Sequence, residues 1–292
     1  MKLHHWLFTG ICLLAGSWNA ALPTRAGTLS APLPDTAKRI ISLSPHATEL
    51  IFSAQAEENL IGVAKGSNYP PAANNIPSVG DSLRPNAELL LSLKPDLVVA
   101  WSSGGLPVSG LQQAERMVPV LSLQPEKLAD ITADLLQIAT LAGTLEQTRP
   151  LANELEEIIS HTRDEYSART LVPVYIFLGN TPLYTLGGKP ILNEMLQVCG
   201  AYNIFKDLNT PSPIVSMESI MQRRPQLILA GAAKEETPKD LLAFFNNKGF
   251  AFEQRDIVTQ HPDILFRPTA RLIRALPGLC KSIDQVRASA RP

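Results

Sequence analysis

The sequence predicts an α/β protein of two Rossmann-like lobes, each built on a parallel sheet, with a single long helix joining them. Three observations lead to this fold class: a segment that occurs twice, a buried-strand pattern at the end of each copy, and a long amphipathic stretch between the copies. The 292 residues are enough for two domains of ordinary size. We expect a first lobe over residues 27–143, the joining helix over 144–168 and a second lobe over 169–292.

The repeated segment is the clearest sign of a duplication. Residues 86–100, NAELLLSLKPDLVVA, return as residues 216–230, SMESIMQRRPQLILA, in the same register. Each copy begins with a helix N-cap residue, has an acid two places later and ends its helix before a proline. The apolar run that follows, LVVA or LILA, is typical of a strand buried on both faces of a parallel sheet. The two lobes should therefore share one architecture.

The stretch between the copies, LEQTRPLANELEEIISHTRDEYSA at residues 145–168, predicts the joining helix. A helix of about 22 residues would be roughly 33 Å long, enough to reach from one lobe to the other. Its apolar residues recur at one-faced helical spacing, with acids and amides between them: Leu145, Leu151, Leu155, Ile158 and Ile159.

The remaining segments predict alternating strands and helices. Residues 28–38 are predicted to be a proline-containing leader, residues 179–188 a loop at a strand end, and residues 263–271 a loop before the C-terminal helix. Ser44 followed by Pro45 marks a helix start. Strands are expected at 39–44, 60–63, 118–123, 173–178 and 256–259, and helices at 110–117, 126–141 and 191–198.

The N-terminus has the pattern of a secretory signal peptide over residues 1–26. It has a basic start, an apolar run from Trp6 to Ala15 and small residues before a proline-rich exit. Cleavage after Ala20, Ala21 or Ala26 fits this pattern. The apolar run is too short for a membrane-spanning helix. We therefore expect a soluble, exported protein.

Composition and cysteines limit the partners and the compartment. The formal net charge is −1 and 45% of the residues are apolar, so we expect no nucleic-acid partner and no disorder. Without the signal peptide, two cysteines remain, Cys199 and Cys280. An even pair in an exported chain favours a disulfide. The alternative is two separately buried thiols.

No pattern in the sequence predicts catalysis, a metal site or a cofactor. Ser44 and His46 lie in no Gly-x-Ser-x-Gly context, and no glycine loop matches a phosphate-binding fingerprint. His46, His161 and His261 have no ligand spacing, so we expect them to be solvent-exposed or helix-capping. A periplasmic enzyme using His46 and nearby acids is kept as a hypothesis of another class.

Aromatic and polar residues fall on the loops that follow strand ends, where α/β sheets bind ligands. Such rings with a few polar anchors suit a large, partly apolar, amide-bearing small molecule. Trp101 is the strongest candidate because it directly precedes Ser-Ser-Gly-Gly, whereas Tyr69 and Phe266 could equally fill core at loop bases. The candidates are Tyr69, Trp101, Tyr184, Asp263, Phe266, Arg267 and Arg271.

These residues and motifs resemble a known family over essentially the whole mature chain. RIISLSPHATELIF, NYPP, the two repeat blocks and VCGAYNIF are similar to the periplasmic cobalamin-binding proteins (BtuF type) of vitamin B12 ABC importers. The resemblance implies the class III periplasmic binding protein architecture, a periplasmic, non-enzymatic carrier and cobalamin as ligand. Individual motifs are shared with carriers of haem and ferric siderophores, which are the alternative ligands.

The resemblance also implies roles for single residues. One glutamate on each lobe, Glu88 and Glu218, would dock on the inner-membrane permease dimer that works with its ATPase, the carrier being monomeric when free. The alternative is that each acid only complements its helix dipole. Cys199 and Cys280 match the family's disulfide, and Tyr69, Trp101, Asp263 and Arg267 match its cleft residues. This chain departs at Ser82 and Ser212, where enteric relatives have tryptophans.

Overall fold

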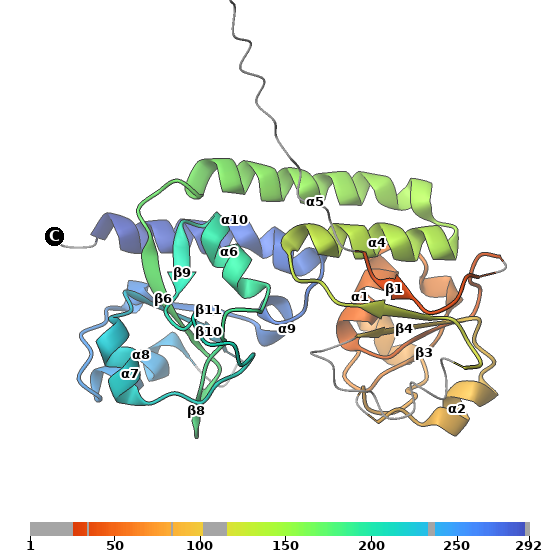
Figure 1. Cartoon of the computed structure of the whole chain (residues 1–292), viewed down its shortest axis with the longest axis horizontal. Helices are drawn as coiled ribbons and strands as arrows, with labels where there is room; N and C mark the ends of the chain where they lie inside the picture. Colours follow the sequence, from red (N-terminus) through yellow and green to blue (C-terminus); the bar gives the residue numbers. More distant parts are fainter. Residues whose placement is uncertain (1–25, 34, 83, 102–115, 233–236, 290–292) are drawn as a thin grey trace, which may run out of the picture.

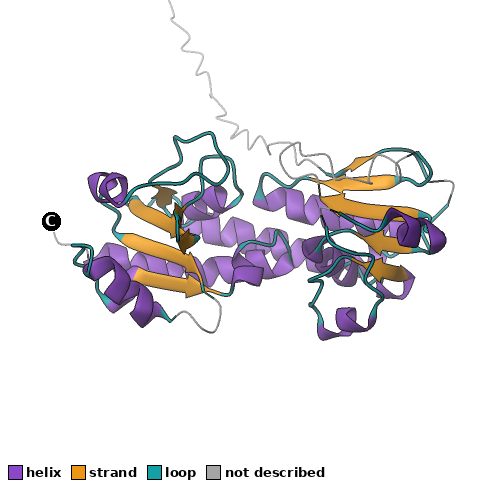
Figure 2. Ribbon diagram, turned by 90° about the horizontal axis from the view of Figure 1, so that it is seen from below, coloured by secondary structure: helices purple, strands orange, loops and turns teal. Residues whose placement is uncertain are grey.

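The protein consists of two lobes side by side, with the helix α5 (Leu145–Tyr166) running along one side of both (Figure 1). The structure is a computed structural model and describes residues 26–33, 35–82, 84–101, 116–232 and 237–289. Seen from the side away from α5, the two sheets lie apart, with helices crossing behind them (Figure 2). This arrangement confirms the predicted fold class.

The first lobe is built on a five-stranded sheet in the order β1-β5-β4-β2-β3. All neighbouring strands are parallel except β1, which is antiparallel to β5. The central strand β4 is buried over its first four residues, as the LVVA run predicts. The strands are β1 Thr28–Leu29, β2 Ile40–Ser42, β3 Leu60–Val63, β4 Leu97–Trp101 and β5 Val120–Leu123.

The second lobe has a four-stranded parallel sheet in the order β11-β10-β6-β9. The repeat relates its β10 to β4, and β10 is likewise buried over its first four residues. A separate two-stranded ladder joins β7 to β8. The strands are β6 Val172–Phe177, β7 Gly179–Asn180, β8 Leu183–Tyr184, β9 Ala201–Asn203, β10 Leu227–Gly231 and β11 Ile257–Gln260.

The helices mostly begin where the sequence supplies a cap. Asn86 and Ser216, the first residues of the repeat copies, accept hydrogen bonds from Leu89 and Ser219 and so cap α2 and α7. The other bounds are α1 Pro45–Ser53, α2 Ala87–Ser92, α4 Leu128–Ala142, α6 Leu192–Val198, α7 Met217–Arg223, α8 Pro238–Asn246, α9 Pro262–Leu265 and α10 Ala270–Ser289, with the 3-10 turns η1 Glu57–Asn59, η2 Pro71–Asn75 and η3 Gln254–Asp256.

The helix α5 joins the lobes through a shared apolar core. It packs against α4 of the first lobe and α10 of the second. One continuous cluster of buried apolar residues includes Leu97 of β4, Leu155 and Ile159 of α5, and Leu229 of β10. We call the part of this cluster along α4, α5 and α10 the spine. Because the spine is common to both lobes, separating them would expose apolar surface.

Polar contacts also cross between the lobes at the spine. The carboxyl of Glu194 in α6 accepts a hydrogen bond of 2.5 Å from the backbone N–H of Leu128, the first residue of α4. Its other oxygen accepts a bond of 2.9 Å from Arg163 of α5. A carboxylate at a helix N-terminus is stabilised by the helix dipole and by the unpaired N–H groups there. The second lobe thus anchors the start of a first-lobe helix.

Several expectations are confirmed and others need correction. The disulfide between Cys199 and Cys280 is present and links α10 to the end of α6. The predicted leader contains a strand, β1, because Thr28 and Leu29 pair with β5. The predicted loop 263–271 contains part of a short helix, α9, which starts at Pro262, and the loop 179–188 contains the β7–β8 ladder.

Three predicted features lie partly or wholly outside the described residues. They are the signal peptide, of which only Ala26 is described, the residues after Trp101, and most of the helix expected at 110–117. In the described part of the chain, no helix is long and apolar enough to cross a membrane.

Candidate functional site

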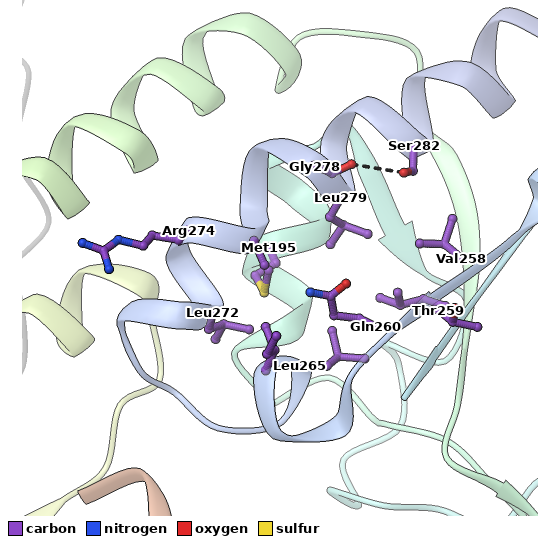
Figure 3. A pocket seen from close by; sticks show the side chains of 13 residues that line it. Met195, Val258, Thr259, Gln260, Leu265, Leu272, Arg274, Gly278, Leu279 and Ser282 are labelled. Atoms are coloured by element: carbon purple, nitrogen blue, oxygen red, sulfur yellow. Dashed lines mark hydrogen bonds between the residues drawn. The ribbon is translucent and has the colours of Figure 1, made fainter. Parts of the chain in front are cut away.

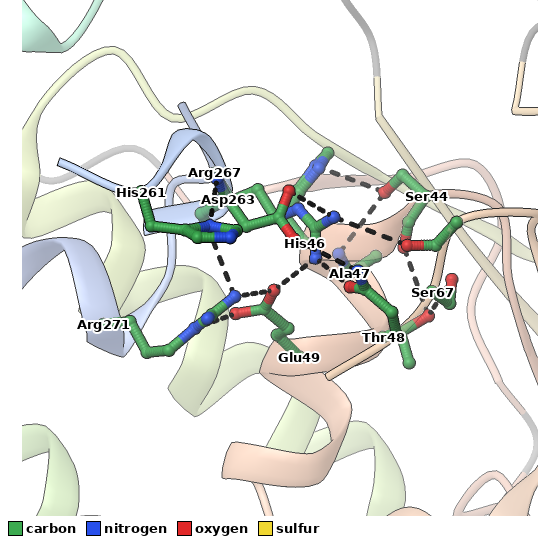
Figure 4. Close-up of polar contacts among 12 residues, drawn as sticks. Ser44, His46, Ala47, Thr48, Glu49, Ser67, His261, Asp263, Arg267 and Arg271 are labelled. Atoms are coloured by element: carbon green, nitrogen blue, oxygen red, sulfur yellow. Dashed lines mark hydrogen bonds and ion pairs between the residues drawn. The ribbon is translucent and has the colours of Figure 1, made fainter. Parts of the chain in front are cut away.

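The two lobes meet in a cluster of polar side chains that we call the cross-lobe network (Figure 4). Its centre is Glu49 of α1. Arg267 donates a hydrogen bond of 2.8 Å to one carboxyl oxygen of Glu49, and the Nε of Arg271 donates one of 2.9 Å to the other. Glu49 and Arg271 are 222 residues apart in sequence. The network is made of Glu49, Asn68 and Tyr69 from the first lobe and Asp263, Arg267 and Arg271 from the second.

Burial makes Glu49 the critical member of this network. Its side chain is 2% exposed, and those of Arg267 and Arg271 are 13% and 20% exposed. A carboxylate this deep is stable only if its charge is paired and hydrogen-bonded. Arg271 offers a two-pronged guanidinium, the geometry that best matches a carboxylate. The lobes must therefore be correctly aligned for Glu49 to be satisfied.

The NYPP loop of the first lobe supplies the rest of the network. Asn68 donates a hydrogen bond of 3.1 Å to Asp263 and accepts one of 2.8 Å from Arg267. The guanidinium of Arg271 lies over the Tyr69 ring, 3.8 Å from its centroid, which is a cation–π contact. Tyr69 nevertheless remains 42% exposed. An aromatic face and fixed polar groups therefore lie together between the lobes.

Local sequence positions these groups. Ser44 caps α1 by accepting a hydrogen bond from Ala47, which stabilises the start of the helix that carries Glu49. In the second lobe, the His261 ring accepts a hydrogen bond from the N–H of Asp263 and caps α9. With Pro262 at the first helical position, this cap explains why a helix replaces the expected loop. Asp263 and Arg267 also form an ion pair of 2.7 Å.

Trp101 ends β4 and remains 38% exposed, with its ring against that of His46. The ring centroids are 4.4 Å apart at an interplanar angle of 82°, an edge-to-face contact. His46 is buried, so the expectation of a solvent-exposed or helix-capping residue was wrong for this histidine. Burial, with the charge of Arg267, lowers the pKa of His46 from 6.5 to about 3. His46 is therefore a neutral support for the indole.

Tyr184 lies on β8 in a segment held by its neighbours. Thr185, Gly187 and Gly188 donate backbone hydrogen bonds to residues 208–213. A Cβ on Gly187 would come within 2.2 Å of the carbonyl oxygen of Thr210, so only glycine fits there. The Tyr184 side chain is exposed. Ser212 is exposed in the opposing segment, whereas Ser82 is partly buried in the loop before α2.

Phe266 lies deeper than the other aromatic candidates. Its ring packs against Gly231, the last residue of β10, where a Cβ would come within 2.3 Å of the ring. It also packs against the main apolar cluster. Phe266 thus fills core at the base of the loop, while its contact with a ligand stays a prediction. The predicted roles of Tyr69, Trp101 and Tyr184 also stay predictions.

The predicted docking acids occupy matching places on the two lobes. Glu88 and Glu218 are exposed in the first turns of α2 and α7. Figure 1 shows both helices on the side of the molecule away from α5. Hydrogen bonds from its own backbone N–H and from Ser216 lower the pKa of Glu218. Each lobe therefore carries one exposed acid at the start of a helix on this side of the molecule.

The histidines and acids show no metal-binding arrangement in the described residues. No group of three or more His, Cys, Asp or Glu side chains there could hold a metal ion. His261 caps α9, as expected for one of the three histidines, and His161 is exposed on α5.

Comparison with known proteins agrees with this architecture. Residues 40–264 match the family described as "Periplasmic binding protein". The chain belongs to the periplasmic binding protein family. Among curated members, the "Vitamin B12-binding protein" of Pectobacterium atrosepticum is 33% identical over 86% of this chain and 90% of its own length. The protein of the same name from Yersinia pestis (strain Pestoides F) is 30% identical over 86% of this chain and 88% of its own length.

Solved structures place this periplasmic binding protein among the same relatives. The "periplasmic Vitamin B12 binding protein BtuF of Vibrio cholerae" has a TM-score of 0.76 and 27% identity, covering 87% of this chain and 99% of its own. The "periplasmic heme-binding protein RhuT from Roseiflexus sp. RS-1" has a TM-score of 0.72 at 24% identity, covering 86% and 99%, and shares the fold. The resemblance to vitamin B12-binding proteins is confirmed.

Sequence reasoning missed Glu49 and Asn68 as parts of this site. The available signal was a pair of arginines, Arg267 and Arg271, one helical turn apart with too few nearby acids to pair both. A carboxylate partner for these arginines therefore had to come from a distant part of the sequence. Glu49 stands out among the apolar residues of α1, but the sequence does not reveal which charge it meets.

The first prediction concerns the burial of Glu49. Glu49→Gln should lower the free energy of unfolding by about 3 kcal/mol, because Arg271 loses its carboxylate partner and Arg267 keeps only Asp263, while both guanidinium groups stay mostly buried. Urea unfolding measures this loss. The matched control is Glu154→Gln, which breaks an exposed ion pair of 2.9 Å with Arg274, and we expect it to cost less than about 1 kcal/mol. Equal losses would contradict the importance of the network.

The second prediction follows from the lowered pKa of His46. The unfolded chain protonates this ring near its ordinary pKa of 6.5 and the folded protein only near 3. Protonation therefore favours the unfolded state, and the free energy of unfolding falls as the pH drops from 6.5 towards 3. His46→Gln should make this fall smaller, whereas His161→Gln, at an exposed site, should not. Urea unfolding at pH 7 and pH 4.5 gives the change in the free energy of unfolding for each protein. An identical change in the His46→Gln variant and the unmodified protein would refute the lowered pKa of His46.

Proposed function

We propose that this protein captures cobalamin in the periplasm, between its two lobes, and delivers it to an ABC transporter. The observation that carries the proposal is the similarity to proteins named vitamin B12-binding protein, which extends over both lobes. Cobalamin enters the proposal as cargo and not as a resident cofactor. The protein acts as a carrier and not as an enzyme.

The geometry between the lobes supports a ligand of this kind. A corrinoid has a broad, partly apolar ring with amide side chains, so it needs aromatic surfaces and a few hydrogen-bonding groups. Tyr69, Trp101 and Tyr184 present exposed rings from the two lobes. Asp263 and Arg267 of the cross-lobe network supply fixed polar groups beside them. The proposed binding residues are Tyr69, Trp101, Tyr184, Asp263, Phe266 and Arg267.

The two serines define where this site differs from the enteric pattern. Ser82 and Ser212 stand at equal distances before the helix caps Asn86 and Ser216, so they are equivalent under the repeat. Relatives with tryptophans there have two more aromatic faces. In this chain, Tyr69, Trp101 and Tyr184 therefore carry a larger share of the contact with the ligand.

The third prediction is a test of the ligand. Protein incubated with cyanocobalamin should retain cobalt and the corrin absorption bands through gel filtration. Trp101→Ala should weaken binding about tenfold, because loss of one aromatic contact costs roughly 1.4 kcal/mol. The control is Leu171→Ala, an exposed apolar residue before β6, which should not change the affinity. A Soret band or a charge-transfer band in protein purified from its host would instead indicate haem or a ferric siderophore.

The proposed partner is an inner-membrane permease dimer with its ATPase, and the proposed free carrier is a monomer. A dimer presents two equivalent surfaces, and Glu88 and Glu218 provide one carboxylate for each from equivalent helices. The helix dipole alone would favour an acid in any first helical turn. It does not require the same register on both lobes.

The fourth prediction separates docking from ligand binding. The double variant Glu88→Lys, Glu218→Lys should abolish most uptake into vesicles containing the transporter and leave cobalamin affinity unchanged, because both acids are exposed on helices that face away from α5. Glu146→Lys is the matched control, since Glu146 is also an exposed acid in a first helical turn, that of α5. Unchanged uptake by the double variant would rule out the docking role.

A further inference from the structure

The residue directly before strand β1 contacts a buried carboxyl group that has no role in the proposed function. The backbone nitrogen of Gly27, directly before β1, donates a hydrogen bond of 2.8 Å to Oδ1 of Asp134. Asp134 lies on α4 and is 1% exposed. β1 continues from Gly27 as an antiparallel partner of β5, with Leu29 opposite Leu121. Residues 27–29 are thus held by the pairing with β5 and by the hydrogen bond from the Gly27 nitrogen.

Asp134 lacks the partner that a buried carboxylate needs. Its Oδ2 atom has no hydrogen-bond partner among the described residues. No described basic side chain forms an ion pair with it, and the charged group that acts on it is the carboxyl of Asp130 on the same helix. β1 and β5 carry no charged side chain. Burial, reinforced by Asp130, raises the pKa of Asp134 to about 7 although the Gly27 N–H opposes this.

In the second lobe β11 is an edge strand, so no described strand lies at the position equivalent to β1. Val258 of β11 corresponds to Leu121 of β5, because they pair with the repeat-related residues Leu229 and Val99. A pocket of about 330 Å³ opens there between β11 and α10, and Ser282 lies at its edge (Figure 3). No aspartate or glutamate lines this pocket. Of the two equivalent positions, only the one beside β1 therefore has a buried acid, Asp134, among the described residues.

The sequence around Gly27 fits a processing site. Thr24 and Ala26 are small residues at the third and first positions before the Ala26–Gly27 bond, the pattern that signal peptidase cleaves. Ala26 is exposed. A Cβ on Gly27 would lie 2.9 Å from both the Leu123 side chain and the Ser122 carbonyl oxygen, so the close approach to β5 requires glycine.

We propose that signal peptidase cleaves the Ala26–Gly27 bond and that the new α-ammonium group of Gly27 forms a buried ion pair with Asp134. Hydrolysis adds water across the amide: the C–N bond breaks, Ala26 receives the hydroxyl group, and the Gly27 nitrogen gains a hydrogen. The amine then binds a proton from solvent, because an α-amino group has a pKa of about 7.7–8.0. An ammonium has three donors where the amide had one, enough for both oxygens of Asp134.

Cleavage changes the charge next to Asp134, because an ammonium group replaces a neutral amide. In the uncleaved chain the carboxyl faces one amide and another acid. After cleavage the ammonium compensates the carboxylate, so the folded mature protein gains stability that the precursor lacks. The pKa of the α-amino group should rise on folding. The stabilisation should be present around neutral pH, be lost above about pH 8 as the amine deprotonates, and be lost in acid as the Asp134 carboxylate is protonated. Among the described residues, Asp130 on α4 is the charged group that acts on Asp134.

The test has two parts, and the first is the intact mass of the protein exported from its full precursor. We expect a chain that begins at Gly27. A chain beginning at Ala21, at Leu22 or at any other residue overturns the proposal. This outcome is independent of cobalamin binding, so the two proposals can fail separately.

The second part measures coupling between the terminus and the acid. Protein beginning at Gly27 is compared with protein beginning at Ala26, each with and without Asp134→Asn. The extra residue should lower Tm by about 3 °C or more in the presence of Asp134 and have a clearly smaller effect in the Asp134→Asn background. Asp35→Asn, at an exposed acid of the leader, is the control and should leave the full effect of the extension. Additive effects of the extension and Asp134→Asn would overturn the ion pair.

Discussion

The buried apolar spine along α5 determines how the rest of the molecule works. Most proteins with two domains bury a separate core in each, and the domains then move about a linker. Here one cluster of buried residues continues from the first sheet through α4, α5 and α10 to the second sheet. Opening the lobes widely would remove this surface from its apolar surroundings. The shared core therefore restrains the position of one lobe relative to the other.

The cross-lobe network adds direction to this constraint. Apolar packing is not directional, whereas the two-pronged contact of Arg271 with Glu49 requires one orientation of the two groups. A buried ion pair contributes little net stability compared with apolar packing, but its geometry penalises misalignment. The spine thus fixes the distance between the lobes and the network fixes their rotation. The lobes that carry Glu88, Glu218 and the exposed aromatic rings are consequently held in a defined arrangement.

The sequence predicted the parts of this structure that depend on local patterns. Helix caps, apolar periodicity and the repeat located α2, α5, α7, β4 and β10, and the register of Glu88 and Glu218 followed from the same repeat. It did not reveal Glu49 at the centre of the site, because its partners are 218 and 222 residues away. Strand β1 was missed for a similar reason. Two residues have no period of their own, and their pairing with β5 depends on the tertiary fold.

The contacts between the lobes have an approximate symmetry that the duplication explains. Glu49, in the first helix of the first lobe, binds Arg271 at the start of α10. Glu194, in the first helix of the second lobe, binds the N-terminus of α4. Since α4 and α10 are the helices that follow the equivalent strands β5 and β11, each lobe uses an acid to hold the other's long helix. Only one of these acids meets guanidinium groups beside the exposed aromatic rings. The duplication therefore supplied two equivalent anchors, and one of them became the centre of the cross-lobe network.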